Sequence, residues 1–338
     1  MRAGAALVAG FTLLLVAGAP ARAAAPCTAA TAACARWMPM APGTRALVYA
    51  THALDAPDEH VTRALVVIHG AGRNADNYFR SAVAAAFLAG ALDDTLVVAP
   101  RFAASDGRGC HDALAPDEVN WPCTGQSWRS GSAAVGHEAL TSFDVADQIL
   151  RLLARRDVFP HLGAIVVAGH SAGGQFVTRY EMASEVHDSL GVPVTYVVAN
   201  PSSYAYPDAN RPVPGAAEAR PFADRANCTT YDRWPYGLED RVGYAARPTV
   251  DQLRARLLGR PVVYLAGELD TLPLANFDAS CPAMAQGPSR LARAQAFTQH
   301  LARQYGATPR LLVVPLCGHN ARCMFTADPV LPILFPRP

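Results

Sequence analysis

The stretch Ile165-Val-Val-Ala-Gly-His-Ser-Ala-Gly-Gly174 decides how the rest of the chain is interpreted. Its first four residues are apolar and mostly β-branched, which is typical of a buried strand, while the residues after Ser171 have helical character. The turn between them is tight, because Gly169 and Gly173 flank the serine and have no Cβ atom. The stretch therefore predicts a strand, a sharp turn and a helix, with the hydroxyl of Ser171 exposed at the apex.

Strand-like apolar runs alternate with helix-like segments along most of the chain. Besides the run before Ser171, the predicted strands are 45–51, 63–68, 95–100, 193–199, 260–266 and 310–315. The predicted helices are 74–91, 142–155, the segment after Ser171 and 291–305. This alternation predicts an α/β fold, in which a mostly parallel central sheet carries helices on both faces.

The composition limits the classes of partner. The chain has 338 residues, of which 51% are hydrophobic, so one large core in a single domain is expected. The formal net charge of +1 gives no reason to expect nucleic acid or an anionic membrane as a partner.

Residues 1–25 have the character of a secretory signal peptide. Arg2 supplies a positive charge, and the apolar run that follows, residues 5–19, is short for a membrane span. Small residues around Ala23 offer cleavage sites. An uncleaved membrane anchor is the alternative. We therefore expect a secreted or periplasmic protein with no stable membrane span after cleavage.

All eight cysteines follow this leader, and an even number in an exported chain indicates disulfides. Closeness along the chain favours the pairs Cys27–Cys34, Cys110–Cys123 and Cys317–Cys323, which leaves Cys228 for Cys281. A zinc site is the alternative, although no C-x-x-C pair occurs. We expect residues 26–44 to form an N-terminal arm clipped by the first bridge, ahead of a single domain over residues 45–338.

Two long segments, residues 103–136 and 201–247, fit no strand–helix unit. Loops of this length are usually functional or disordered, and these contain too many aromatic residues for disorder. We interpret both as ordered insertions that wall or cover the site around Ser171. The aromatic candidates for contact with a substrate are Trp121, Trp128, Tyr204, Tyr206 and Trp234. Packing inside the loops is the alternative for each.

A serine nucleophile needs a base, and the base needs an acid that orients it. In a strand–turn–helix arrangement of this kind, the acid and then the histidine follow later strands. Asp270 comes directly after the predicted strand 260–266, with Glu268 as its rival. His319 follows the last predicted strand, and the neutral pKa of histidine suits a general base. A loop or capping role for Asp270 and a surface position for His319 are the alternatives.

Two backbone N–H groups are needed to hold an oxyanion. Ala172 directly after the nucleophile offers one, and Ala71 in the glycine-flanked turn after the strand 63–68 offers the other. An ordinary glycine turn is the alternative for Ala71. His170 inside the turn is expected to pack beside the serine and to line the substrate site.

These residues resemble the α/β-hydrolase family. His69-Gly70-Ala71, the pentapeptide 169–173, Asp270 and His319 stand in the family's order, each at a predicted strand end. The resemblance covers about residues 45–334 and implies the α/β-hydrolase fold. The leader and the cysteines make the chain similar to secreted bacterial serine esterases and polymer depolymerases of this family.

The resemblance also implies a mechanism, which is acyl transfer in two steps. Ser171 attacks a carbonyl carbon, His319 takes its proton, Asp270 orients His319, and the N–H groups of Ala71 and Ala172 hold the oxyanion. The reaction needs no metal and no organic cofactor. A carboxylic ester, small or polymeric, is the expected substrate. An amidase or peptidase with the same triad is the alternative, and a binding protein without activity is disfavoured by the intact triad.

Overall fold

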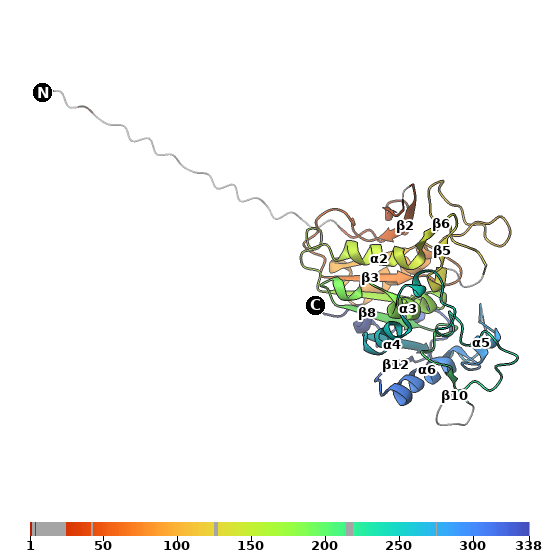
Figure 1. Ribbon diagram of the computed structural model, residues 1–338. Helices are drawn as coiled ribbons and strands as arrows, with labels where there is room; N and C mark the ends of the chain where they lie inside the picture. Colours follow the sequence, from red (N-terminus) through yellow and green to blue (C-terminus); the bar gives the residue numbers. More distant parts are fainter. Residues whose placement is uncertain are drawn as a thin grey trace.

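An eight-stranded sheet forms the centre of the molecule in the computed structural model (Figure 1). The model describes residues 1, 4, 25–41, 43–124, 128–213, 219–274 and 276–337. The predicted signal peptide lies almost wholly outside the described residues. The strands of the sheet are β1 (Ala35–Pro39), β2 (Arg45–Ala50), β4 (Thr95–Pro100), β3 (Arg63–Ile68), β7 (Ala164–His170), β8 (Val194–Ala199), β11 (Val262–Gly267) and β12 (Arg310–Val314), in spatial order.

The six strands from β4 to β12 in that order run parallel, and β2 pairs antiparallel with both of its neighbours, β1 and β4. The chain therefore brings the carboxyl ends of β3, β7, β8, β11 and β12 to one edge of the sheet. The predicted α/β fold with a mostly parallel sheet is confirmed. Strand β1 is a difference, because it places part of the predicted N-terminal arm at the edge of the sheet.

Helices cover both faces of the sheet. On one face lie α2 (Ser142–Leu153), α3 (Ala172–Ala183), α4 (Val250–Gly259) and α6 (Arg290–Tyr305), whose buried side chains share one core cluster. On the other face lie α1 (Ala75–Leu88), α7 (Ala321–Thr326) and α8 (Leu331–Leu334). The short elements are the hairpin of β5 (Ala133–Ala134) and β6 (His137–Thr141), the pair β9 (Asn210–Arg211) and β10 (Arg220–Pro221), and α5 (Cys281–Met284).

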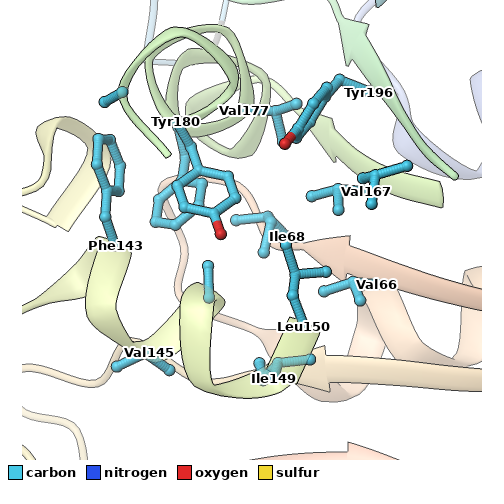
Figure 2. Packing of buried hydrophobic residues seen from close by; sticks show 14 of the residues in the cluster. Val66, Ile68, Phe143, Val145, Ile149, Leu150, Val167, Val177, Tyr180 and Tyr196 are labelled. Carbon is cyan, nitrogen blue, oxygen red and sulfur yellow. The ribbon is translucent and has the colours of Figure 1, made fainter. Parts of the chain in front are cut away.

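The central strands supply side chains to both cores, because successive residues of a strand point to opposite faces. Val66 and Ile68 of β3 and Val167 of β7 pack toward α2 and α3 (Figure 2). Their neighbours Val67 and Val166 belong to the core beneath α1. This burial on both faces explains why these strands have continuous apolar sequences rather than an alternating pattern.

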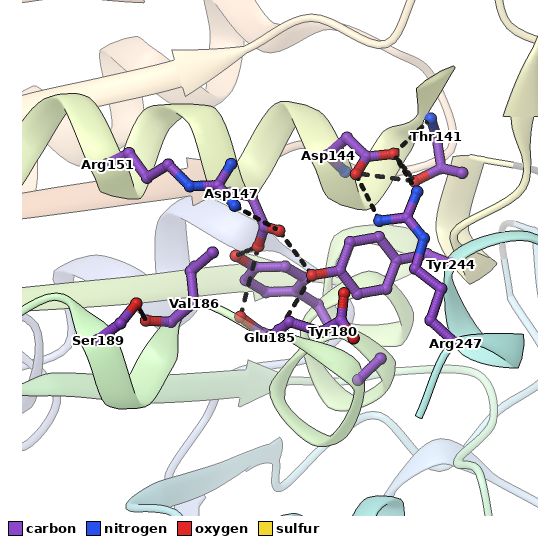
Figure 3. Close-up of polar contacts among 12 residues, drawn as sticks. Thr141, Asp144, Asp147, Arg151, Tyr180, Glu185, Val186, Ser189, Tyr244 and Arg247 are labelled. Atoms are coloured by element: carbon purple, nitrogen blue, oxygen red, sulfur yellow. Dashed lines mark hydrogen bonds and ion pairs between the residues drawn. The ribbon is translucent and has the colours of Figure 1, made fainter. Parts of the chain in front are cut away.

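The second long segment is fastened to α2 by a buried polar cluster (Figure 3). The Tyr244 and Tyr180 hydroxyl groups donate to the two oxygens of Asp147, at 2.6 and 2.7 Å. Burial raises the pKa of Asp147. Nearby, Arg247 pairs with Asp144, which also completes the capping box at the start of α2. These contacts hold the end of the segment 201–247 beside α2.

The four predicted disulfides all form, as Cys27–Cys34, Cys110–Cys123, Cys228–Cys281 and Cys317–Cys323. The first joins the N-terminal arm to itself just before β1. The last closes the loop between β12 and α7, which carries His319. Among the described residues, no helix has the length and apolarity needed to cross a membrane.

Candidate active site

Ser171 lies on the sharp turn between β7 and α3, with φ of 59° and ψ of −119°. A left-handed φ is unfavourable for a residue with a side chain, so the packing around the turn must hold it. A Cβ atom on Gly169 would collide with the carbonyl group of Gly173, and one on Gly173 would collide with that of Ile68. Only glycine fits at these two positions, which explains the spacing of the motif.

Three side chains from three strand ends meet at this edge of the sheet. The Ser171 Oγ lies 2.9 Å from His319 Nε2, and His319 Nδ1 lies 2.7 Å from Asp270 Oδ2. The Asp270 side chain is 2% exposed and that of His319 is 10% exposed. The three residues predicted from the sequence therefore form one continuous hydrogen-bonded chain. Glu268, the rival acid, instead accepts a hydrogen bond from the Leu316 N–H at 2.8 Å.

The loops that carry Asp270 and His319 are tied to each other by Asn200, which follows β8. Its side-chain oxygen accepts from the Gly267 N–H at 2.8 Å, and its amide group donates to the Gly318 carbonyl at 3.2 Å. Asn200 is buried and has a φ of 46°. Asparagine tolerates this left-handed backbone better than most residues. One side chain thus fixes the acid-bearing and the base-bearing loops to the same point.

The second oxygen of Asp270 faces a buried arginine. Arg290 Nη1, at the start of α6, lies 3.4 Å from Asp270 Oδ1, and the side chain of Arg290 is fully buried. Arg290 also donates to the Ser202 hydroxyl group at 2.8 Å and to the Leu274 carbonyl at 3.1 Å. Asp270 is therefore held from both sides, by the imidazole on one oxygen and by the guanidinium on the other.

The turn after β3 is held by His69. Its Nδ1 donates to the Gly70 carbonyl at 2.8 Å, and its Nε2 accepts from the Phe102 N–H at 3.0 Å. Burial lowers the pKa of His69 to about 4, so the ring is neutral near neutral pH and can accept the second bond. Ala71 follows in this turn and borders the cavity beside Ser171. Ala172 is the first residue of α3, so its N–H has no acceptor within the helix.

Beneath the turn, Tyr78 of α1 shares a hydrogen bond of 3.1 Å with His170 Nδ1. The rings of His170 and His319 lie 4.6 Å apart, centre to centre. Burial, and then the charge on His319, lower the pKa of His170 well below its ordinary value. A neutral ring beside His319 does not repel the imidazolium that His319 forms when it takes a proton.

Comparison with known proteins agrees with this geometry. The model of the alpha/beta hydrolase family matches residues 65–331. The chain belongs to the alpha/beta hydrolase family. No curated protein matches this hydrolase.

Many solved structures match its fold, and two of them are hydrolases of polymers. A poly(3-hydroxybutyrate) depolymerase from Bordetella parapertussis is 26% identical, with a TM-score of 0.59, over 87% of this chain and 85% of that one. A poly(aspartic acid) hydrolase-1 from Sphingomonas sp. KT-1 is 24% identical, with a TM-score of 0.59, over 86% of this chain and 94% of that one. The family and the depolymerase neighbour support a carboxylic-ester hydrolase.

A cavity of about 360 Å³ opens beside Ser171. It is bordered by the turn after β3, the first two turns of α1, His170, His319 and the start of α7. His170 borders this cavity, and its contact with a substrate stays a prediction. The aromatic predictions do not hold there, since the cavity is not lined by Trp121, Trp128, Tyr204, Tyr206 or Trp234.

Those five rings are buried in the core on the α3 side of the sheet. Trp128 stacks on Phe102 with ring centres 5.2 Å apart, and Tyr204 stacks on Phe297 at 4.4 Å. A long segment with little regular structure needs apolar contacts of its own to stay ordered. The aromatic residues serve that packing. That the segments 103–136 and 201–247 wall the active site stays a prediction.

The sequence gives little indication of several residues that position the site. Asn200, Arg290 and Tyr78 belong to no motif, and each acts on a residue far away in the chain. The positions of Asn200 directly after a strand and of Tyr78 on the buried face of α1 are the only signals. Among the described residues, no cluster of three histidine, cysteine, aspartate or glutamate side chains could hold a metal ion.

Proposed function

We propose that this chain is an exported serine hydrolase that cleaves carboxylic esters with Ser171 as nucleophile, His319 as base and Asp270 as the orienting acid. The observation that supports this most directly is the unbroken path of hydrogen bonds from the Ser171 Oγ through both ring nitrogens of His319 to Asp270. A hydroxyl group is a weak nucleophile, and it becomes effective when a positioned base removes its proton during attack.

In the first step, Ser171 Oγ attacks the ester carbonyl carbon while His319 Nε2 takes the hydroxyl proton. Asp270 accepts the Nδ1 proton of the ring in a hydrogen bond, which fixes the tautomer and stabilises the imidazolium. His319 then returns the proton to the departing alcohol, and an acyl group remains on Ser171. In the second step, a water molecule attacks the acyl carbon while His319 Nε2 takes its proton. The bond from the acyl carbon to Ser171 Oγ then breaks, His319 returns the proton to Ser171 Oγ, and the acid is released.

The negative charge that develops on the carbonyl oxygen needs fixed donors. The N–H groups of Ala71 and Ala172 are our candidates, because Ala71 borders the cavity beside Ser171 and Ala172 follows Ser171 directly as the first residue of α3. A single donor of this kind is worth roughly 2.7–4 kcal/mol of the activation barrier. The contacts of His69 and Tyr78 beneath the turn after β3 therefore help to keep the Ala71 N–H in place.

Ester-linked hydroxy acids, alone or in a polymer, are the substrate class we favour. The neighbour that is 26% identical is a poly(3-hydroxybutyrate) depolymerase. The cavity beside Ser171 is shallow and bordered largely by polar residues, and it continues along α1 and α7 into a second hollow. A channel of this form suits an extended chain with repeated carbonyl groups better than a compact apolar ester.

Export is supported by the four disulfides, which persist in an oxidising compartment. The predicted signal peptide would direct the chain there. N-terminal sequencing of the mature protein from the culture medium and the periplasm tests both the leader and the compartment. Intact chain that stays in the cytosol would contradict this part of the proposal.

The test of the reaction is the variant Ser171→Ala, assayed with p-nitrophenyl butyrate and with 3-hydroxybutyrate oligomers. We expect turnover to fall at least about a thousandfold, since the nucleophile is removed. Ser189→Ala is the matched control and should retain full activity, since Ser189 is exposed in the short helix His187–Ser189 after α3. A fluorophosphonate label should be found on the peptide that carries Ser171. Normal turnover by Ser171→Ala, or labelling of another serine, would refute the assignment.

A further inference from the structure

A second hollow adjoins the cavity at Ser171. Asn77 and Ser81 of α1 and Asn320 and Arg322 at the start of α7 border both spaces. Because they share these four residues, the two hollows adjoin along the line where α1 and α7 pack together, and we call them together the groove. Thr326 lies at its far part.

Polar, mostly uncharged side chains dominate this groove. The Asn77 side-chain oxygen accepts from Arg80, and the Asn320 side-chain oxygen accepts from the Cys323 N–H, at 2.6 and 3.0 Å. Both oxygens are thus used within the protein, and each amide NH₂ group remains as the donor. Two amide donors along a groove match the carbonyl oxygens of an extended ester or acid chain.

Arg322 is the one permanently charged side chain among the described residues that border either hollow. It is exposed, and no carboxylate of the described residues lies within ion-pair distance of it. The nearby Arg80 differs, since Asp76 neutralises it at 2.5 Å. The place where the two hollows adjoin therefore has a positive charge without an ion-pair partner among the described residues.

We propose that Arg322 is a specificity residue that binds a carboxylate of the substrate, placed some bonds away from the ester group at Ser171. The planar guanidinium presents paired N–H donors that match a carboxylate, and such charge-assisted bonds are strong. A chain of ester-linked hydroxy acids ends in a carboxylate, so the groove selects short acids or the acid end of a chain. This inference rests on the proposed ester hydrolysis at Ser171.

The experiment compares two substrates that differ in one charge. The butyryl esters of 4-hydroxybutyric, 5-hydroxyvaleric and 6-hydroxyhexanoic acid have a free carboxylate on the alcohol side, as the acid end of a hydroxy-acid chain has, and their carboxamide-capped forms do not. For the native protein, we expect kcat/KM to favour the free acid over the capped form at one spacer length. In Arg322→Gln that preference should fall about fivefold, mainly through KM, while the capped ester is hydrolysed as before.

Two controls separate charge from structure. Arg322→Lys keeps the charge without the planar fork and should retain part of the preference. Arg303→Gln removes an exposed arginine of α6 that lies outside the groove and should change nothing. Added salt should reduce the preference of the native protein but leave the capped substrate unaffected.

Direct binding keeps the inference testable without turnover. 5-Butyryloxyvalerate, which has its carboxylate on the alcohol side of the ester, is titrated calorimetrically into Ser171→Ala, with and without Arg322→Gln, and we expect affinity to depend on Arg322. An equal loss on free and capped esters, or equal affinity in both variants, would overturn the role of Arg322 while the proposed function stands. Absence of any ester hydrolysis that depends on Ser171 would instead refute the proposed function, and the titration would still decide the carboxylate site.

Discussion

Replacement of Gly70 by alanine tests whether the turn after β3 controls the reaction through its backbone. An added Cβ atom would lie 2.6 Å from the Tyr78 hydroxyl oxygen and 3.4 Å from Tyr78 Cζ. The first contact is about 0.8 Å shorter than an ordinary one. Gly70 has no left-handed φ, so the steric contact alone opposes a side chain there. Tyr78 is buried and bonded to His170, so it has little room to retreat.

The turn must therefore move, and Ala71 moves with it. Overpacking of this kind costs about 1–3 kcal/mol of the free energy of unfolding. Misplacing one oxyanion donor costs roughly 2.7–4 kcal/mol of the barrier, or about 10²–10³ in kcat. We expect Gly70→Ala to lower kcat on p-nitrophenyl butyrate about a hundredfold, with a smaller effect on KM, because the donor acts most strongly in the transition state.

The decisive comparison is a double-mutant cycle. Tyr78→Phe removes the oxygen atom that an alanine at residue 70 would meet, so the double variant should regain most of the kcat that Gly70→Ala loses. Gly72→Ala is the matched control, since its Cβ atom would meet only the Asn74 side chain, at 3.3 Å. Native kcat in Gly70→Ala, or a double variant no faster than Gly70→Ala alone, would refute this reasoning.

Two further predictions concern residues that hold the site. Asn200→Ala removes the hydrogen bonds to Gly267 and Gly318. We expect thermal denaturation to show a free energy of unfolding lower by about 1–3 kcal/mol, and ester assays to show a kcat lower by about tenfold. Native values for both quantities would exclude the positioning role of Asn200. The pKa of His69 is lowered from 6.5 to about 4 in the folded protein. Between these two pH values the unfolded chain binds a proton at this residue and the folded protein does not. The free energy of unfolding therefore decreases as the pH falls from 6.5 to about 4. His69 should contribute about 3 kcal/mol to the decrease in the free energy of unfolding between pH 7.5 and pH 4. Urea titrations at these two pH values should show a smaller decrease for His69→Gln than for the native protein. An equal decrease in both proteins would contradict the lowered pKa of His69.

The sequence allowed the fold and the three central side chains to be predicted because their signals are local. Apolar runs mark strands that are buried on both faces, and glycines at 169 and 173 mark a turn in which the carbonyl groups of Gly173 and Ile68 leave no space for a Cβ atom. Asp270 and His319 could be found because parallel strands bring their carboxyl ends to one edge. Residues that follow the ends of different parallel strands therefore lie close together in the folded protein.

The supporting residues could not be predicted, because their partners are distant in the chain. Asn200 bonds to Gly318, and Arg290 meets Asp270 only after α6 packs against the sheet. For the two long segments, the aromatic composition led to a wrong prediction. The aromatic residues around Trp128 and Tyr204 suggested a binding surface, whereas they fill the core. A polar groove bordered by asparagines has no comparable pattern in the sequence.

Backbone strain in this protein is concentrated where the chemistry is proposed. Among the described residues, the non-glycine positions with left-handed φ are Arg73, Ser171, Asn200, Asp240, Asn276 and Leu316. All but Asp240 border the cavity, adjoin its lining or lie in the loops that position Asp270 and His319. Each such residue costs of order 1–2 kcal/mol, which only a well-packed surrounding can sustain.

Leu316 illustrates the consequence. It is 80% exposed, so burial does not favour a leucine there, and glycine would remove the strain from its φ of 58°. Its N–H bonds to Glu268, two residues before Asp270, and Cys317 beside it is bridged to Cys323. The base-bearing loop is therefore constrained at its backbone, by a carboxylate and by a disulfide within four residues of His319. A loop held this firmly keeps the imidazole within reach of both Ser171 and Asp270 before a substrate arrives, so little reorganisation remains for the reaction itself.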